Sequence, residues 1–400
     1  MAKVAIMGFG TVGSGVGEVL TMNAASIAAR AGEAVELKYV LDIREFPGSP
    51  FEPYLIHDFA ILEQDPEVTV VAECMGGIGV AKSFTERCLK AGKSVVTSNK
   101  QLVATYGDEL FELARQNHVN YLYEASVGGG IPLIRPIGNC LAANEITEIF
   151  GILNGTTNYI LTKMLKEGTP FDQALKEAQA RGYAELDPTA DIEGHDACRK
   201  IAILASLVGG KQIDPDSVFT IGITGITYED TKFAAAAGRR IKLLGRLVRG
   251  EDQVITAYVA PHLLKEDFLL ANVDDVFNGV VVRGNAVGEV LLYGPGAGKL
   301  PTASAVAADM IDAVKHREKL QKLDWLPGGV AGDFEALQLR WYVRTSADVK
   351  TVESALDDVE VITEAELPGQ VAVLTGEMSH AELTKRLMGI ETLTVLPLLD

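Results

Sequence analysis

A glycine-rich turn near the N-terminus constrains the fold more than any other feature. The apolar run Val4 to Met7 leads directly into Gly8-Phe9-Gly10-Thr11-Val12-Gly13, and Val16, Val19 and Leu20 follow at helical spacing. A strand, a GxGxxG turn and a helix in this order hold a pyrophosphate with backbone amides and the positive end of the helix. Glycine also occurs in turns that are only structural, but this placement favours dinucleotide binding.

Each glycine of the turn has a separate function in such a site. Gly8 permits the tight turn, Gly10 lets the backbone approach the pyrophosphate, and Gly13 lets helix and strand pack closely. The predicted second strand ends at Asp42, where a carboxylate binds the ribose hydroxyls of NAD, whereas Arg44 would suit the 2′-phosphate of NADP. The sequence leaves both choices open, together with a solvated loop charge at either position.

Short apolar runs alternate with helical patterns over residues 1–130. Several runs are continuously apolar, which is typical of parallel strands with helices on both faces. We therefore predict a Rossmann-type α/β domain over 1–130, completed by about 301–325, where Ala303 to Lys315 fits a returning helix. The predicted strands are Val4 to Met7, Glu36 to Leu41, Thr69 to Cys74, Ser94 to Thr97 and Asn120 to Glu124.

Composition excludes several classes of protein. The 400 residues carry a formal charge of −18, which would repel a nucleic-acid backbone. Four dispersed cysteines without a CxxC pair indicate neither a disulfide framework nor a structural zinc site, and suit a reducing compartment. No run approaches the ~18 apolar residues of a membrane span. We expect a soluble, cytoplasmic protein with neither nucleic acid nor membrane as its partner.

Two further parts follow the first domain. From Gly128 onward, strands such as Glu148 to Leu153 alternate with long helices, which predicts an α+β domain over 131–300. After Pro327-Gly328-Gly329, residues 335–400 show the βαββαβ order of a ferredoxin-like module. The predicted elements of this module are strands 338–344, 359–363, 370–374 and 393–396, and helices 348–356 and 379–388.

The densest charged motif is the stretch from Gly182 to Lys200. Asp196 and Lys200 are four residues apart on the predicted helix that Gly209-Gly210 ends, so they are neighbours on one face. A surface ion pair would explain this spacing. In an enzyme that transfers hydride to a carbonyl, however, Lys200 can give a proton to the oxygen that becomes an alkoxide, and Asp196 can bind a cationic group of the substrate.

Lys100 is the other candidate for a residue that binds cofactor or substrate, whereas the histidines and cysteines are weak candidates. Ser98-Asn99-Lys100 follows the predicted strand Ser94 to Thr97, at the carboxyl edge where ligands of such sheets bind, so Lys100 would face cofactor or substrate unless it is simply solvated. The six histidines lack the spacing of metal ligands. Cys74 and Cys140 lack a flanking nucleophile motif.

Taken together, these motifs resemble the homoserine dehydrogenase family. The resemblance runs from about Val4 to Lys315. It implies a Rossmann-type cofactor domain, a catalytic and dimerisation domain, and direct hydride transfer between L-aspartate 4-semialdehyde and L-homoserine with NAD or NADP, in the biosynthesis of threonine, methionine and isoleucine. The matching motifs are GFGTVG (8–13), TSNK (97–100), EASVGGGIPLI (124–134), GILNGTTNYIL (151–161), GYAELDPTADIEGHDACRK (182–200) and GPGAGKLPTASAV (294–306).

The resemblance also implies roles for single residues. Lys200 is expected to be the general acid, and Lys100 its partner toward cofactor and substrate. Glu185 and Asp196 would hold the ammonium and hydroxyl of homoserine, with Asp191 in support. The remaining implied residues are Asn154, Gly155 and Thr156 in the pocket floor, Phe9, Thr11, Val12, Ser98 and Gly298 at the cofactor, and a sodium loop formed by Glu124 with the backbone carbonyls of Val127, Gly129 and Ile131.

The C-terminal module resembles an ACT domain, which in this family implies feedback by threonine. The usual acidic-proline-glycine turn after its first strand is replaced by Thr345-Ser346-Ala347-Asp348. A threonine site and a mere brace for a homodimer or homotetramer therefore stay open as alternatives.

Two other functions compete with this interpretation. A semialdehyde dehydrogenase that forms an acyl phosphate would need a nucleophilic cysteine, for which only Cys140 lies near the domain junction. A catalytically silent NAD-binding sensor would have lost the acid-base lysine, but Lys200 is present.

Overall fold

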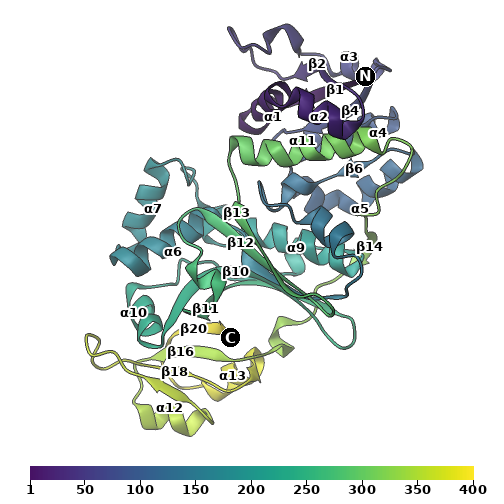
Figure 1. Cartoon of the computed structure of the whole chain (residues 1–400). Coiled ribbons are helices and arrows are strands. Elements are labelled where there is room, and N and C mark those ends of the chain that lie inside the picture. The colour runs from purple at the N-terminus through teal and green to yellow at the C-terminus, as the bar shows by residue number, and fades with distance from the viewer. The chain divides into compact units, whose positions relative to one another are not determined.

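The structure is a computed structural model that describes all 400 residues. Two compact units make up the chain (Figure 1). Unit 1 contains residues 1–145, 202–215 and 294–330, and unit 2 contains residues 146–201, 216–293 and 331–400.

Unit 1 is built on a six-stranded sheet in which every pair of neighbouring strands is parallel. The strand order β3-β2-β1-β4-β5-β6 is that of a doubly wound dinucleotide-binding sheet, as predicted. Side chains of the central strands, such as Val4, Ile6, Val70 and Val95, are fully buried. The strands are β1 (Ala2–Met7), β2 (Val35–Leu41), β3 (Leu55–Ile56), β4 (Val68–Glu73), β5 (Ser94–Thr97) and β6 (Tyr121–Leu122).

The last strand of this sheet is shorter than predicted. We expected it to run from Asn120 to Glu124, but Glu124 begins a 3₁₀ turn (Glu124–Ser126). Its carboxylate accepts hydrogen bonds from the backbone N–H groups of Leu133, Ile134 and Arg135, which bends the chain back on itself.

Helices of unit 1 include the predicted return of the chain. Helix α11 lies among the N-terminal elements, green against purple in Figure 1, and a Cβ on Gly15 of α1 would come within 3.0 Å of Ala303. It begins at Lys299 rather than Ala303, because Pro301 is tolerated in a first helical turn. Two short strands, β8 (Lys211–Ile213) and β14 (Leu326–Gly329), pair separately. The helices are α1 (Thr11–Met22), α2 (Ala24–Ala31), α3 (Phe59–Gln64), α4 (Gly79–Lys90), α5 (Lys100–Gln116) and α11 (Lys299–Lys315).

Unit 2 is organised around a larger sheet with the order β13-β12-β7-β10-β11-β20-β16-β18-β17, with β9 beside β11. Its centre is the long antiparallel pair β10 and β11, in register from Arg239 opposite Lys265 to Arg249 opposite Ile255. Strand β7 contains the predicted strand at 148–153 except for Leu153, and begins two residues earlier. The strands of this part are β7 (Ile146–Ile152), β9 (Phe219–Thr220), β10 (Arg239–Arg249), β11 (Ile255–Lys265), β12 (Phe277–Gly284) and β13 (Gly288–Pro295).

Five helices accompany this part of the chain. Asn154 caps α6 by accepting from the N–H of Thr157, and a capping box of Thr227 and Asp230 begins α10. Gly210, with φ +68°, ends α9 as predicted. The chain contains no helix with the length and apolar character needed to cross a bilayer. The helices are α6 (Gly155–Glu167), α7 (Phe171–Ala180), α8 (Thr189–Ile192), α9 (His195–Gly209), of which residues 202–209 are assigned to unit 1, and α10 (Tyr228–Ala236).

The C-terminal module has the predicted βαββαβ order. Its first predicted strand breaks at Arg340, so that β15 (Gln338–Leu339) pairs with β19 (Met378–Ser379) and only the remainder enters the main sheet. The module is not a separate body, since β20 lies parallel to β11 with Leu263 opposite Leu398. Its elements are β16 (Trp341–Thr345), α12 (Val349–Ala355), β17 (Glu360–Ile362), β18 (Val371–Leu374), α13 (His380–Arg386) and β20 (Thr392–Leu399).

Candidate active site

The glycine turn of unit 1 has the geometry of a pyrophosphate cradle. Gly8 has φ +86°, and a Cβ on Gly13 would lie only 2.0 Å from the carbonyl oxygen of Gly8. Helix α1 begins at Thr11 with Gly10 as its N-cap, and neither a capping side chain nor an acidic residue covers its first turn. The first N–H groups therefore face outward at the positive end of the helix, as a bound phosphate requires.

Asp42 and Arg44, which the sequence offered as alternative cofactor ligands, are hydrogen-bonded to each other. Both oxygens of the Asp42 carboxylate accept from the Arg44 side chain at 2.9 Å, and Oδ2 also accepts from the N–H of Phe9 at 2.6 Å. The Arg44 guanidinium lowers the pKa of Asp42 to about 2. Asp42 thus ties the second strand to the glycine turn and presents the half-exposed guanidinium of Arg44.

A cleft of about 530 Å³ joins these groups. It contains the predicted residues Phe9, Gly10, Thr11 and Arg44, but sequence reasoning missed its aromatic wall. The ring of Phe9 packs edge-on against two rings of the segment Phe46–Phe51, at centroid distances of 5.1 and 5.5 Å. The signal for this wall was the Phe-Pro-Gly-Ser-Pro-Phe run at 46–51, in the loop that follows the second strand. The lining residues not predicted are Ser14, Glu18, Phe46, Ser49, Pro50, Phe51 and Lys299.

Other predicted cofactor residues lie at the ends of elements in unit 1. Ser98 follows β5, and Lys100 is the first residue of α5, whose N-cap Asn99 accepts from the N–H of Leu102 at 3.1 Å. Both Ser98 and Lys100 are half-buried. Gly298 is the N-cap of α11 with φ +121°, a conformation that glycine adopts without strain. Val12 is the second residue of α1.

The acid and lysine cluster lies in unit 2 and is buried. Lys200 donates from Nζ to Oδ2 of Asp196 and to the backbone carbonyl of Leu153, each at 2.7 Å. Both charged residues are less than a tenth exposed. This pair is therefore not the surface ion pair that the spacing alone permits. With two of its three protons donated inside the protein, the ammonium retains one for a bound group.

Asn154 connects the two carboxylates of this cluster. Its side-chain N–H groups reach Oδ1 of Asp191 at 2.7 Å and Oδ2 of Asp196 at 2.9 Å. Burial raises the pKa of Asp191. Beside it, the hydroxyl of Thr156 donates to the carbonyl of Tyr183 at 2.6 Å, and a Cβ on Gly155 would collide with the carbonyl oxygen of Val276 at 2.7 Å. These contacts fix the start of α6 beside the two carboxylates.

Glu185 is the predicted site residue that the hydrogen bonds of unit 2 do not bring into the cluster. It is exposed on the loop after α7, where its backbone carbonyl accepts from Gln179. Leu186, next in the chain, is 97% exposed. The adjacent Asp187 accepts from the N–H and hydroxyl of Thr189. These two hydrogen bonds join the end of the loop to Thr189, the first residue of α8.

The predicted cation loop is a tight turn in unit 1. All its predicted residues, Glu124, Val127, Gly129 and Ile131, are buried. A Cβ on Gly129 would lie 2.2 Å from the carbonyl oxygen of Gly296, so only glycine fits there. The two oxygens of the Glu124 carboxylate already accept from three backbone N–H groups and from Arg135. The Glu124 side chain is thus committed to holding the loop.

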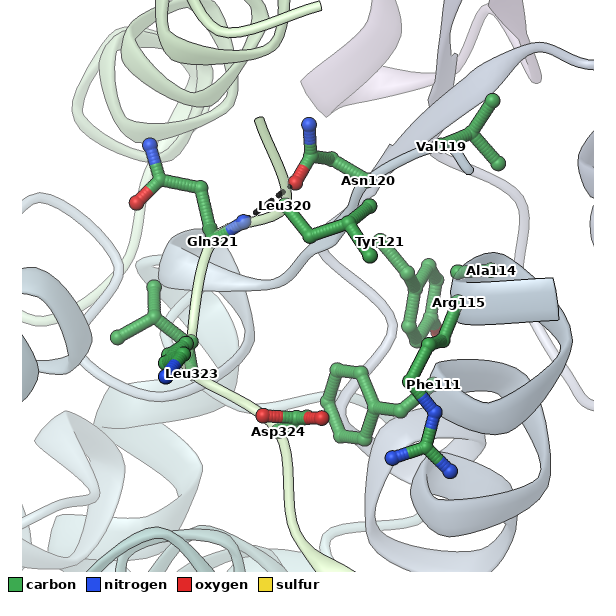
Figure 2. Close-up of a pocket in the computed structure, with 11 residues that line it drawn as sticks. Phe111, Ala114, Arg115, Val119, Asn120, Tyr121, Leu320, Gln321, Leu323 and Asp324 are labelled. Atoms are coloured by element: carbon green, nitrogen blue, oxygen red, sulfur yellow. Dashed lines mark hydrogen bonds between the residues drawn. The ribbon is translucent and has the colours of Figure 1, made fainter. Parts of the chain in front are cut away.

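A second cavity in unit 1, of about 240 Å³, contains none of the predicted residues. It lies where β6 begins, between Phe111 of α5 and the segment around Leu323, with Arg115 and Asp324 at its rim (Figure 2). Asn120 accepts from the N–H of Gln321 at 2.8 Å beside it. Ligands of parallel sheets bind at the opposite, carboxyl edge, so this cavity is not the candidate active site.

Comparison with known proteins agrees with this geometry. A family model described as the homoserine dehydrogenase NAD binding domain matches residues 8–124, and one described as homoserine dehydrogenase matches residues 132–311. The homoserine dehydrogenase of Neisseria gonorrhoeae is 44% identical over 315 residues, which is 78% of this chain and 72% of that protein.

Solved structures show the same relationship. A homoserine dehydrogenase from Thiobacillus denitrificans superimposes with a TM-score of 0.90 and 34% identity, over 100% of this chain and 98% of that one. A hyperthermophilic archaeal homoserine dehydrogenase in complex with NADPH gives a TM-score of 0.65 at 28% identity, over 78% of this chain and 97% of that one. Neither a thiol-dependent dehydrogenase nor a silent sensor is favoured by these matches. This chain belongs to the homoserine dehydrogenase family.

Proposed function

We propose that this chain interconverts L-homoserine and L-aspartate 4-semialdehyde by direct hydride transfer, with Lys200 as the general acid and base. Family membership makes it an NAD(P)-dependent oxidoreductase that acts on a CH–OH group. The observation that carries the assignment of roles is the buried cluster in which Lys200, Asp196, Asn154 and Asp191 are joined by direct hydrogen bonds.

The proton chemistry follows from the contacts of Lys200. A bound nicotinamide supplies or accepts the hydride at the carbon. As negative charge grows on the aldehyde oxygen, the ammonium of Lys200 donates its remaining proton there, and in the reverse direction the neutral amine takes the hydroxyl proton. Asp196 and the carbonyl of Leu153 hold Nζ in one orientation, so the proton donor needs no rearrangement when the reaction begins.

Recognition of an amino-acid substrate requires charges of both signs. The carboxylates of Asp191 and Asp196 suit the substrate ammonium, and we assign Lys100 to the substrate carboxylate and the cofactor. Glu185, on its exposed loop, is proposed to complete the ammonium site when substrate is bound. Gly155 and Thr156 are assigned to the floor of the pocket.

We further propose that NADP is the preferred cofactor. Both oxygens of Asp42 already accept from Arg44, which leaves the carboxylate poorly placed to bind a ribose hydroxyl. The guanidinium of Arg44 instead offers a charged donor in the cleft beside Phe9 and Thr11, as a 2′-phosphate requires. The archaeal relative with NADPH supports this choice.

Two finer assignments complete the proposal. A sodium ion would be held by main-chain carbonyls of the loop with Val127, Gly129 and Ile131, because the side chain of Glu124 is already committed. The ACT-like module is proposed to brace a homo-oligomer rather than bind threonine, since Thr345 and Ser346 of its altered turn both bond to Glu391.

One spectrophotometric assay tests the function. Purified protein is mixed with L-homoserine and either NADP or NAD, and reduced nicotinamide is followed by its absorbance, with and without threonine and with sodium exchanged for a bulky organic cation. We expect turnover with homoserine, a lower KM for NADP, little effect of threonine and loss of activity without sodium. No reduction of either cofactor would refute the function, whereas the other three results each test one finer assignment.

A further inference from the structure

Glu73 is a buried carboxyl group that none of the functional motifs contains. It is the last residue of β4 and is 0% exposed, at the carboxyl edge of the unit 1 sheet. Its Oε1 accepts from the N–H of Met75 at 2.7 Å, and its Oε2 accepts from the hydroxyl of Thr97 at 2.5 Å. Burying a carboxyl group is costly unless its oxygens are satisfied, so these two bonds are strongly maintained.

The two bonds belong to different loops. Met75 lies in the loop after β4, whereas Thr97 is the last residue of β5, directly before the Ser98-Asn99-Lys100 loop. Thr97 Oγ1 in turn accepts from the N–H of Asn99 at 2.9 Å, and the Asn99 side chain donates to the carbonyl of Gly77 at 2.7 Å. One carboxyl group therefore fixes the spacing between two loops at the ligand-binding edge.

The same network touches both functional elements of unit 1. Asn99 caps α5, so its position determines where that helix begins and where Lys100, its first residue, lies. On the other side, a Cβ on Gly8 would lie 2.8 Å from Cγ of Met75 and 2.9 Å from the backbone of Cys74. A shift of the Met75 segment would therefore displace the glycine turn.

We propose that Glu73 is a positioning residue that, through Thr97 and Asn99, holds the Lys100 loop and the glycine turn in register for hydride transfer. This inference rests on the proposed role of Lys100. Glu73 does not contact substrate in this proposal. Misplacement of reacting groups by about 1 Å can cost roughly 100-fold in rate, so loss of the network should lower kcat even in a folded enzyme.

Conservative variants test the network. Thr97→Val keeps the shape of the side chain but removes the donor to Glu73 and the acceptor for Asn99. Glu73→Gln keeps the shape but replaces one carboxylate oxygen by an NH₂ group. That NH₂ group would face either the N–H of Met75, so that two donors meet, or the Thr97 hydroxyl, which would then have to accept instead of donate. The matched control is Thr85→Val, because the Thr85 hydroxyl is also fully buried in unit 1 but has no hydrogen-bond partner.

Kinetic constants and thermal unfolding are measured for each variant with L-homoserine and NADP. We expect kcat to fall roughly 10-fold or more in Thr97→Val and Glu73→Gln, with unfolding midpoints still above the assay temperature. Thr97→Ser, which restores the hydroxyl, should return kcat to within about threefold of wild type, and Thr85→Val should leave it unchanged. The double variant should be no slower than the slower single variant, because both changes break one network.

Two results would overturn the proposal: an unchanged kcat in both network variants, or activity that falls only in proportion to the folded fraction. The wild-type rate is measured first. An inactive wild type would refute the proposed function, whereas an active wild type with unaffected variants would refute only the role of Glu73.

Discussion

Replacing Lys200 by alanine tests the central assignment of the mechanism. The change removes the ammonium that donates to Asp196 in the buried cluster. General acids typically contribute 100-fold to 10,000-fold in rate, and each factor of ten corresponds to about 1.4 kcal/mol. We therefore expect kcat to fall at least ~100-fold, an increase of about 3 kcal/mol or more in the activation free energy.

The structure also predicts a stability cost that must be separated from the kinetic one. Without Lys200, the buried Asp196 keeps the bond from Asn154 but loses its counter-charge. Losing a hydrogen bond between charged groups costs about 1.5–3 kcal/mol. Lys163→Ala is the matched control, because Lys163 also forms an i,i+4 ion pair, with the exposed Glu167 at the end of α6 and in the reverse order of charges.

Steady-state absorbance gives kcat, fluorescence titration gives the Kd for NADP, and thermal unfolding gives the stability. Lys200→Ala should retain its Kd within about threefold, since none of the glycine-turn contacts involves Lys200. Lys163→Ala should keep both constants. A Lys200→Ala enzyme with kcat within threefold of wild type, while folded at the assay temperature, would refute the role of Lys200 as general acid and base.

Three further predictions follow from other contacts. Arg44→Ala should raise the KM for NADP about 10-fold to 100-fold and that for NAD far less, because a charge-assisted bond to phosphate is worth roughly 1.5–3 kcal/mol; equal changes in both KM values would contradict the assignment. Burial raises the pKa of Glu73 from 4.5 to about 7, so the folded state binds this proton more tightly and the free energy of unfolding falls by about 3 kcal/mol as pH rises between those values. In denaturant titrations from pH 4.5 to 8, the free energy of unfolding of Glu73→Gln should not show that fall. If it changed with pH in parallel with that of the wild type, the contribution of Glu73 would be refuted. Arg344→Met should lower the free energy of unfolding by about 3–5 kcal/mol in urea titrations, because it strands the fully buried Asp230, whose carboxylate accepts from Arg344 at 2.7 Å; a loss below 1 kcal/mol would show the pair to be dispensable.

The cofactor half of the fold was largely predictable from the sequence. Strands such as Ser94–Thr97 and the helix after the glycine turn form where residues close together in the chain favour them. The spacing of apolar residues and the residues that favour turns therefore predicted them. The βαββαβ order of the C-terminal module was recognised from the same local signals. Its attachment was not, because the pairing of β20 with β11 joins residues more than 130 positions apart and neither strand encodes its partner.

The candidate site divides in the same way. The i,i+4 spacing of Asp196 and Lys200 established that they are neighbours, since helix geometry alone brings them together. That the pair is buried, and that Asn154 joins it from 42 residues away, came only from packing of the start of α6 against α8 and α9. Likewise, Asp42 and Arg44 read as competing cofactor ligands until the fold showed them hydrogen-bonded to each other.

The sequence by itself thus determined the elements, the glycine turn and the types of residue that carry the chemistry. Only the tertiary structure decided which of those residues share hydrogen bonds, and that a carboxyl group such as Glu73 is buried at the carboxyl edge of the sheet. The physical reason is that backbone preferences act over a few residues, whereas burial and hydrogen-bond pairing depend on contacts between segments that the chain brings together only when it is folded.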